Sequence, residues 1–433
     1  MFRWTNASAS RREPPRGIVT RNRPSLSTRS TYRRARRCLT KYIGARGARG
    51  ATGARGATGA RGAIGVVVSD DPKGNANCID GRITQLVTEV LHVDPTNPVM
   101  ELIVRAAECL RAGGLVAFPT ETVYGLGAHA LDRRALQRVF AAKERPANDP
   151  LIVHVTAIDD IEPLVVEIPR VARELAARFW PGPLTMVLRR SERVPDEVTA
   201  GLETVAIRVP SHPIAQALLR CARLPIAAPS ANRFSRPSPT RAAHVLADLA
   251  DRIDMILDGG PTTVGLESTV VDLVRQPPMV LRPGAIDAEA LRAVIPDVRL
   301  RARPVDPGTA GLPAPGMLPK HYAPATPLIL FEGDRASTID AIAQTVRLRR
   351  ERGQSVAILA FRDDLEPLRA LGVQLLDLGN ENDPPTVASR LYAALREGDE
   401  LGVDVILVRN ITTDRPLSTA IQDRLRRAAS PTP

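Results

Sequence analysis

Apolar residues recur every three to four positions in some segments and cluster in short runs in others, which predicts alternating helices and strands. A helical spacing covers five segments after residue 83, namely 100–113, 132–143, 170–180, 213–220 and 241–250. Short apolar runs between them predict strands in LVAFP, LIVHV, LTMVLRR, TVAIRVP, PIAA, DMIL, STVVDL and PMVLRP. Because helices and strands alternate without strict regularity, we predict an α/β domain with a mixed, twisted sheet over residues 83–301.

Two helix boundaries carry specific signals. Gly113 stops the helix that begins at residue 100, and it predicts a left-handed cap. Asp132 precedes the next helix and is a candidate N-cap. Both signals predict helix ends at these positions rather than longer continuous helices.

A more regular pattern follows a segment rich in proline and glycine. Residues 302–325 hold six prolines and three glycines, which indicates an ordered linker. Residues 326–430 then alternate strand and helix, which is typical of a smaller Rossmann-like domain with a parallel sheet. No G-x-G-x-x-G follows its first strand, so dinucleotide binding is not indicated.

The charge of the chain lies in its first part. The whole sequence of 433 residues has a formal charge of +12, but residues 1–70 hold 16 Lys and Arg against two acids. Subtracting this +14 leaves −2 for all later residues, so the high charge gives no argument for nucleic-acid binding by the folded part. Within the tail, glycine occupies every third position from Gly44 to Gly65. Without proline in the repeat, we favour a disordered basic tail over 1–82 or untranslated upstream sequence, with a transit peptide as the alternative.

Several function classes are excluded by missing patterns. No apolar run approaches the 18 residues of a membrane helix. The four cysteines are far apart, which indicates neither a disulfide framework nor a zinc site and fits a reducing cytoplasm. The chain contains no Walker A, HExxH or GxSxG pattern. Candidate chemistry therefore has to come from polar clusters beside the predicted strands.

The first polar cluster is FPTETVYGLGAHA, residues 118–130. A buried strand leads into Thr120, Glu121 and Thr122, and we predict a turn at Gly125 and Gly127. Hydroxyls and backbone N–H groups at such a strand end are typical of a ligand pocket in α/β sheets.

The second cluster, KERPANDPLIVH, joins a helix end to a strand. The 3.6-residue period places Lys143 on the buried stripe of its helix, where it could either neutralise the helix dipole or grip an anion. Arg145 precedes a proline, which favours an extended conformation. His154 lies in an apolar strand, where a satisfied core histidine is the common alternative to a functional one.

Further cations and hydroxyls follow other strands. Arg208 lies in an apolar strand and needs a partner, either an acidic side chain or a ligand anion. The serine-rich loop 228–240 and the segment with Glu267 and Ser268 supply hydroxyls, and Arg282 stands at a strand end. This set of cations and hydroxyls suits a polyphosphate together with a small polar molecule.

These motifs resemble a known family. GGLVAFPTETVYGLGA, KERPANDPLIVHV, FWPGPLT, AIRVPSHP, APSANRFSRPSPT, LESTVVDL and LRPGAI resemble, in family order, the YrdC-like domain of threonylcarbamoyl-AMP synthases. APGMLPKHYAP resembles the linker of the two-domain form, and residues 326–430 resemble its C-terminal domain. The resemblance implies an L-threonylcarbamoyladenylate synthase, a nucleotidyltransferase that serves tRNA modification at t6A37.

The family also implies site residues and partners. Lys143, Arg145 and Arg208 would be catalytic. The threonine pocket would be formed by Thr122, His154, Arg208, Ala228 and Ser268. The ATP side would be formed by Lys143, Arg145, Asp149, Thr204, Ser230, Asn232, Ser238 and Arg282. His321 and Tyr322 would form a lid, Mg²⁺ would come with ATP, and no metal would be bound by the protein itself. Expected partners are ATP, L-threonine, bicarbonate and the tRNA-modification proteins that use the intermediate, in the cytoplasm and without a membrane.

Two positions depart from the family pattern. The family usually has Asp-Asn before PLIVH, whereas this chain has Asn148 and Asp149. Pro319 replaces a common aromatic in the linker. An acid beside phosphates is unfavourable unless it faces a cation, so the role of Asp149 is open.

Three other functions compete with a synthase. Related domains are thought to bind RNA, so the first is a non-catalytic RNA-binding module, with weak RNA binding open; the charge of −2 after the tail disfavours it. A carbamoyltransferase of the hydrogenase-maturation type would need zinc-finger cysteines, which the sequence does not have. A regulatory protein with a vestigial site would not need every cation of the site.

Overall fold

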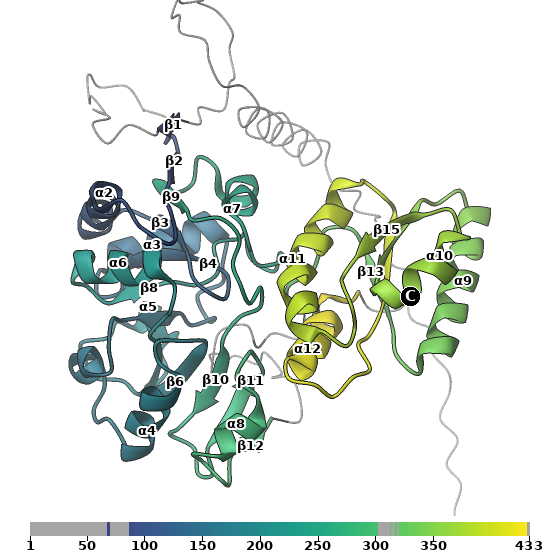
Figure 1. The fold of residues 1–433 in the computed structure, drawn as a ribbon. Coiled ribbons are helices and arrows are strands. Elements are labelled where there is room, and N and C mark those ends of the chain that lie inside the picture. The colour runs from purple at the N-terminus through teal and green to yellow at the C-terminus, as the bar shows by residue number, and fades with distance from the viewer. Residues whose placement is uncertain (1–66, 70–85, 302–311, 313–316, 318–319, 431–433) are drawn as a thin grey trace, which may run out of the picture. The chain divides into compact units, whose positions relative to one another are not determined.

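The structure, a computed structural model, describes residues 67–69, 86–301, 312, 317 and 320–430 (Figure 1). These residues all belong to one compact unit, Gly59–Pro433. The other residues of the predicted tail, 1–66 and 70–82, and most of the predicted linker lie outside the described residues.

The first part of the chain forms one twelve-stranded sheet. Its strands, in chain order, are β1 Val67–Ser69, β2 Glu89–His92, β3 Val116–Pro119, β4 Tyr124–His129, β5 Ile152–His154, β6 Leu184–Arg189, β7 Thr204–Arg208, β8 Ile226–Ala227, β9 Met255–Asp258, β10 Thr269–Asp272, β11 Met279–Arg282 and β12 Arg299–Leu300. Their order in the sheet is β1-β2-β9-β3-β4-β8-β5-β7-β6-β10-β11-β12. Parallel pairs such as β5 with β7 stand beside antiparallel pairs such as β6 with β7, so the prediction of a mixed sheet is confirmed.

Eight helical segments accompany this sheet. They are α2 Met100–Arg111, α3 Arg133–Lys143, the 3-10 helix η1 Asp159–Leu164, α4 Arg170–Phe179, α5 Asp196–Thr199, α6 Pro213–Ala222, α7 Ala242–Leu249 and α8 Ala288–Arg292 among the described residues. The short segments η1, α5 and α8 and the two-residue strand β12 were not predicted, because elements this short show too little of a repeating pattern.

Alternate residues of the central strands face two separate cores. Val116 and Phe118 of β3 pack with α2 and α6, whereas Ala117 between them packs with α3 and α7. This follows from the two-residue period of a strand, which turns successive side chains to opposite faces. The apolar runs of these strands therefore reflect burial on both faces.

The predicted helix boundaries at residues 113 and 132 are confirmed. Gly113 has a φ of 81°, which lies in the left-handed region. The Asp132 side chain accepts a hydrogen bond of 2.9 Å from the Arg134 backbone N–H and so caps α3.

The predicted turn at Gly125 and Gly127 is wrong. Both glycines lie inside β4, which pairs antiparallel with β3 so that Gly125 is opposite Phe118 and Gly127 opposite Val116. A Cβ atom on Gly127 would lie 2.8 Å from the Phe118 ring. The glycines thus let a large ring cover the strand, and the chain reverses earlier, at residues 120–123.

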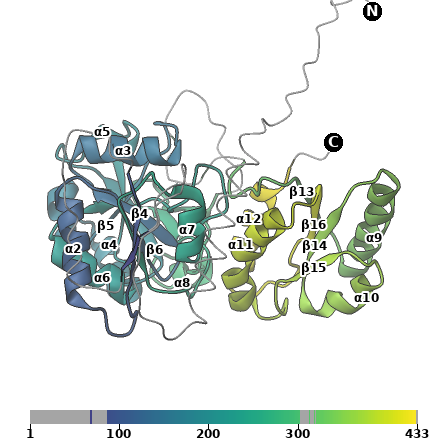
Figure 2. The ribbon, with the colours of Figure 1, turned by 90° about the horizontal axis from the view of Figure 1, so that it is seen from above.

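The last part of the chain forms a second sheet of four parallel strands. These are β13 Leu328–Phe331, β14 Val356–Ala360, β15 Gln374–Asp377 and β16 Val405–Arg409, in the order β13-β16-β14-β15. The helical segments are α9 Arg335–Glu351, η2 Arg362–Asp364, α10 Leu365–Arg369, α11 Pro384–Glu400 and α12 Ser418–Ala428. Figure 2 shows α9 and α10 on one face of this sheet and α11 and α12 on the other, as the Rossmann-like prediction requires.

A short strand lies within the segment predicted to be disordered. Val67–Ser69 form β1, which pairs in parallel with β2. The local sequence VVS is rich in β-branched valine and suits an edge strand, so the prediction of disorder over 1–82 is wrong for these three residues. Within the part of the chain that the structure describes, no helix is both long enough and apolar enough to cross a membrane.

Candidate functional site

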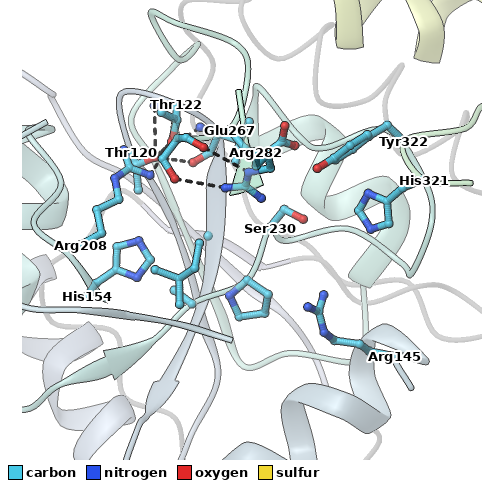
Figure 3. A pocket seen from close by; sticks show the side chains of 16 residues that line it. Thr120, Thr122, Arg145, His154, Arg208, Ser230, Glu267, Arg282, His321 and Tyr322 are labelled. Carbon is cyan, nitrogen blue, oxygen red and sulfur yellow. Dashed lines mark hydrogen bonds between the residues drawn. The ribbon is translucent and has the colours of Figure 1, made fainter. Parts of the chain in front are cut away.

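A pocket is formed by residues from several strands of the large sheet and from the segment that leads to the second sheet (Figure 3). Its lining comprises Thr120, Thr122, Val123, Gly125, Arg145, Ile152, His154, Arg208, Ala228, Pro229, Ser230, Glu267, Ser268, Arg282, His321 and Tyr322. Ten of these were predicted as site residues, and they come from positions between 122 and 322 in the sequence. In Figure 3, His154 and Arg208 lie on one side of the pocket, and Arg145, His321 and Tyr322 lie on the other.

Arg208 ends β7 and is 4% exposed. Its guanidinium forms an ion pair of 2.6 Å with Glu121 and donates a hydrogen bond of 2.8 Å to the Thr122 hydroxyl. The partner that a buried arginine requires is therefore an acidic side chain of the chain itself. Because Arg208 also lines the pocket, its cationic group remains available to a carboxylate that enters beside Thr122.

The loop between β3 and β4 holds its hydroxyls in fixed positions. The Thr120 hydroxyl lies 2.8 Å from that of Thr122 and donates to the Val123 carbonyl at 2.7 Å. The Thr122 and Val123 N–H groups both donate back to the Thr120 oxygen. The Thr120 hydroxyl thus satisfies the backbone groups of this turn. The Thr122 hydroxyl is therefore held where it can accept the hydrogen bond from Arg208.

His154 ends β5 and is 3% exposed. Its Nδ1 atom has no hydrogen-bond partner among the described residues, and its ring meets the Phe118 ring edge-on at 6.4 Å between centroids. Burial, together with the charge of Arg208, lowers the pKa of His154 from 6.5 to about 3. The imidazole is therefore neutral at physiological pH and can exchange a hydrogen bond with a neutral hydroxyl in the pocket.

The low pKa of His154 predicts a loss of stability in acid. The unfolded chain binds a proton below pH 6.5, whereas the folded chain does so only near pH 3, so stability falls as the pH falls through this window. We expect a loss of about 1.4 kcal/mol per pH unit from this one residue. Chemical denaturation at several pH values would show it as a steeper pH slope than that of His154→Gln. His129→Gln, which alters a histidine outside the pocket lining, is the control, and equal slopes for all three proteins would contradict the assignment.

Ser268 and Arg282 both line the pocket and are bonded to each other. The Arg282 guanidinium donates to the Ser268 carbonyl and to its hydroxyl, each at 3.1 Å. The Ser268 hydroxyl also lies 2.7 Å from the Thr185 hydroxyl. These contacts fix a buried cation, 3% exposed, against the loop that precedes β10.

Arg145 follows the left-handed residue Glu144 that ends α3. Its guanidinium pairs with Asp149 at 2.9 Å and donates to the Asp149 and Pro150 carbonyls at 3.1 and 2.7 Å. Asp149 is fully buried, so the carboxylate that departs from the family pattern acts here as the counter-charge of Arg145. Each charge of this buried pair needs the other, because an unpaired charge in the interior costs several kcal/mol.

Five residues predicted on the ATP side do not line the pocket. They are Lys143, Asp149, Thr204, Asn232 and Ser238. The Lys143 ammonium is 1% exposed and donates to the Ser230 and Asn232 carbonyls at 2.5 and 2.6 Å. Burial, followed by the charge of Arg145, holds the pKa of Lys143 well below its usual range. Lys143 thus anchors the loop that carries Ser230, and its direct contact with ATP stays a prediction.

Asn232 and Ser238, two further residues of this group, form contacts that hold the loop 230–238. The Asn232 side chain donates to the Arg233 and Arg236 carbonyls at 2.7 and 3.0 Å. The Ser238 hydroxyl donates to Glu267. Thr204 begins β7, four residues before Arg208, and is only half-buried.

Glu267 is the main pocket residue to which the sequence assigned no role. It is 6% exposed. Burial acts to raise its pKa, but the charges of Arg424 and Arg282, together with hydrogen bonds from Ser238 and Arg424, lower that pKa from 4.5 to about 2. Its position next to Ser268 was a signal in the sequence that it lies at the pocket. Its hydrogen-bond partners lie 29 to 157 residues away, so the sequence could not identify them.

The residues predicted to form a lid lie inside the pocket lining. Tyr322 has a left-handed φ of 62°, and its ring meets that of His321 edge-on at 4.1 Å. The Tyr322 hydroxyl and the His321 Nδ1 atom have no hydrogen-bond partner among the described residues. Two buried polar groups thus face a pocket that can supply a ligand partner.

Glu267, which lines the pocket, and Glu121, which pairs with a lining residue, each have an arginine partner. Glu121 pairs with Arg208 and Glu267 with Arg424. In the described ranges, no group of three or more His, Cys, Asp or Glu side chains is arranged to hold a metal ion.

Comparison with known proteins gives consistent matches over both sheets. The family described as "Telomere recombination" matches residues 108–284, and the family described as "Threonylcarbamoyl-AMP synthase, C-terminal domain" matches residues 286–430. The threonylcarbamoyl-AMP synthase of Pyrococcus abyssi is 45% identical over 75% of this chain and 93% of its own length. That of Bacillus subtilis is 43% identical over 76% of this chain and 92% of its own length. The crystal structure of P. abyssi Sua5 complexed with L-threonine aligns with a TM-score of 0.72 and 42% identity, over 78% of this chain and 97% of that one.

Proposed function

The chain belongs to the threonylcarbamoyl-AMP synthase family, and we propose that it makes threonylcarbamoyl-AMP and pyrophosphate from L-threonine, bicarbonate and ATP. The observation that supports this most directly is the composition of the pocket. One side joins Arg208 to a neutral histidine and the Thr122 hydroxyl, and the other side presents Arg145 and Arg282. The first set suits an amino acid with a carboxylate and a hydroxyl, and the second suits a polyphosphate.

The reaction needs positioning and charge compensation more than it needs a catalytic base. The threonine amine and bicarbonate give an N-carboxylated threonine and release water, and the carbamate oxygen carries a negative charge. This oxygen attacks the α-phosphorus of ATP, the bond to the bridging oxygen breaks, and pyrophosphate leaves with that oxygen. Buried cations such as Arg145 and Arg282 would stabilise the charge that develops on the phosphates. Because the carbamate is labile in water, His321 and Tyr322 would act by closing the pocket against solvent.

We assign Mg²⁺ to the nucleotide rather than to a site built by the protein. The ion would shield the phosphate charges when bound with ATP. Glu267 in the pocket lining and Glu121 beside it already have arginine partners, which supports an ion held by phosphates and water.

The product would pass to proteins that complete threonylcarbamoyladenosine at position 37 of tRNA, in the cytoplasm. Weak RNA binding would be a separate property. RNA affinity that is unchanged after removal of residues 1–70 would favour an RNA-binding role for the body of the chain.

The proposed reaction is tested by pyrophosphate release from ATP with single omissions. We expect release with L-threonine, bicarbonate and ATP together, and a fall to background when either threonine or bicarbonate is left out. Mass spectrometry should detect the adenylate in the complete mixture. Release that ignores either omission would contradict a synthase and indicate a simple ATP pyrophosphohydrolase.

A further inference from the structure

The loop that carries Glu267 and Ser268 is held by residues of the second sheet domain. A Cβ atom on Gly265 would lie 2.4 Å from the Ser389 Cα atom, so the loop backbone contacts α11 directly. Leu266 is fully buried in the apolar cluster of α11 and α12, which includes Leu391 and Leu425. Residues 265 and 266 therefore place the next two residues relative to α11.

Arg424 of α12 connects this loop to a second one. It is fully buried, and its Nε atom donates to Glu267 Oε2 at 2.8 Å. Its Nη2 atom donates to the Pro283 carbonyl at 3.0 Å, one residue after Arg282. One guanidinium therefore spans the two loops that present Ser268 and Arg282 to the pocket.

The Glu267 carboxylate connects Arg424 to Ser238, a residue expected on the ATP side. The Tyr392 hydroxyl of α11 donates to the same Oε2 atom at 2.9 Å, while Ser238 donates to Oε1. The guanidinium of Arg424 also lies 5.1 Å from the centre of the Tyr322 ring. The carboxylate is thus fixed by two groups of the second domain on one oxygen and by the serine loop on the other.

We propose that Arg424, assisted by Tyr392, is a positioning residue of the active site and sets the ATP-binding geometry through Glu267. With Arg424 present, Glu267 has a full counter-charge and leaves Arg282 directed at the pocket. Without it, the buried carboxylate would recruit Arg282, whose guanidinium is held at the neighbouring residue Ser268, and draw that cation away from the nucleotide. The second domain thereby completes the active site instead of serving only as an appendage. This inference rests on the proposed function, because it assigns Arg282 and Ser238 to ATP.

The test compares ATP and threonine in full-length Arg424→Gln. We expect the KM for ATP to rise about 30-fold, while the Kd for threonine, measured without ATP, changes less than about threefold. The double variant Glu267→Gln/Arg424→Gln removes the uncompensated carboxylate. Its KM for ATP should be about tenfold lower than that of Arg424→Gln. A role limited to stability would not separate the two substrates in this way and would not give this recovery.

Arg236→Gln is the matched control, because Arg236 also pairs with a carboxylate of α11, Asp399, at 3.3 Å but does not line the pocket. It should change the KM for ATP less than about threefold. If Arg424→Gln does not fold, Tyr392→Phe deletes a single hydroxyl and should raise the KM for ATP about fivefold.

Three results would overturn the inference: an unchanged KM for ATP in a folded Arg424→Gln, an equal loss in Arg236→Gln, or no recovery in the double variant. Failure of the proposed function can be told apart from failure of this inference. In that case the unaltered chain would release no pyrophosphate in response to threonine. In that case direct binding of ATP, measured without turnover, still tests Arg424.

Discussion

Replacing Arg208 with alanine should abolish tight threonine binding while leaving ATP binding nearly intact. Its guanidinium is buried in the pocket wall and is held in place by the hydrogen bond to Thr122, so it can bind the carboxylate of an incoming threonine. Losing such a charge-assisted contact from a buried arginine should weaken threonine binding about 100-fold or more. Isothermal calorimetry with threonine and with ATP, each titrated alone, measures the two affinities separately.

The control for Arg208 addresses its ion pair with Glu121. Removing the arginine alone leaves a carboxylate that is 7% exposed without this partner, which destabilises the fold as well as the site. Glu121→Gln/Arg208→Gln removes both charges and should restore stability without restoring threonine affinity. Arg189→Ala, an exposed position opposite Thr204 on the same pair of strands, should change neither. Threonine binding that survives in the double variant would show that Arg208 has only a structural role.

Replacing Arg145 with alanine should give the opposite pattern. This cation lies across the pocket from Arg208, beside His321 and Tyr322 (Figure 3). We expect ATP affinity to fall about 100-fold and threonine affinity to change less than about threefold. Arg145→Lys should not restore ATP binding, because an ammonium group cannot reproduce the planar contacts of Arg145 with Asp149 and the Pro150 carbonyl.

Asp149→Asn separates the charge of the pair from its geometry. Arg145 also donates to the Asp149 and Pro150 backbone carbonyls, so the guanidinium should stay in place when the carboxylate becomes an amide. ATP affinity should then change less than about fivefold in either direction. A loss as large as that of Arg145→Ala would show that the carboxylate itself is needed, and equal losses of both substrates in Arg145→Ala would mean that the two sides of the pocket are wrongly assigned.

The positions of single cations illustrate what a sequence can predict. The helical period placed Lys143 on the buried side of its helix, and the side chain is 1% exposed. The same pattern could not show that its ammonium is used by the Ser230 and Asn232 carbonyls, nearly 90 residues away. The requirement of a partner for Arg208 was likewise evident, but the choice of Glu121 depends on how β7 lies beside the β3–β4 loop.

The strand β4 shows a different limit. Two glycines near threonines favour a turn by local propensity, yet the antiparallel pairing with β3 and the Phe118 ring keep residues 124–129 extended. The preference of a glycine for a turn is worth only about 1 kcal/mol, and pairing with the neighbouring strand outweighs it. Strand pairing of this kind involves residues that the sequence does not mark as partners.

The sequence by itself determined the mixed and parallel sheets, the helix ends at Gly113 and Asp132, and most residues that line the pocket, because periodicity, caps and motifs are local properties. Only the tertiary structure decided that Asp149 is the counter-charge of Arg145 and that Glu267 pairs with Arg424, 157 residues later. The physical reason is that burial makes an unpaired charge costly, but any acid and arginine that the fold brings together can satisfy it. For Glu267 and Arg424 the packing of the two domains decides which ones meet, whereas Arg145 and Asp149 meet within the segment between α3 and β5, once the fold buries it.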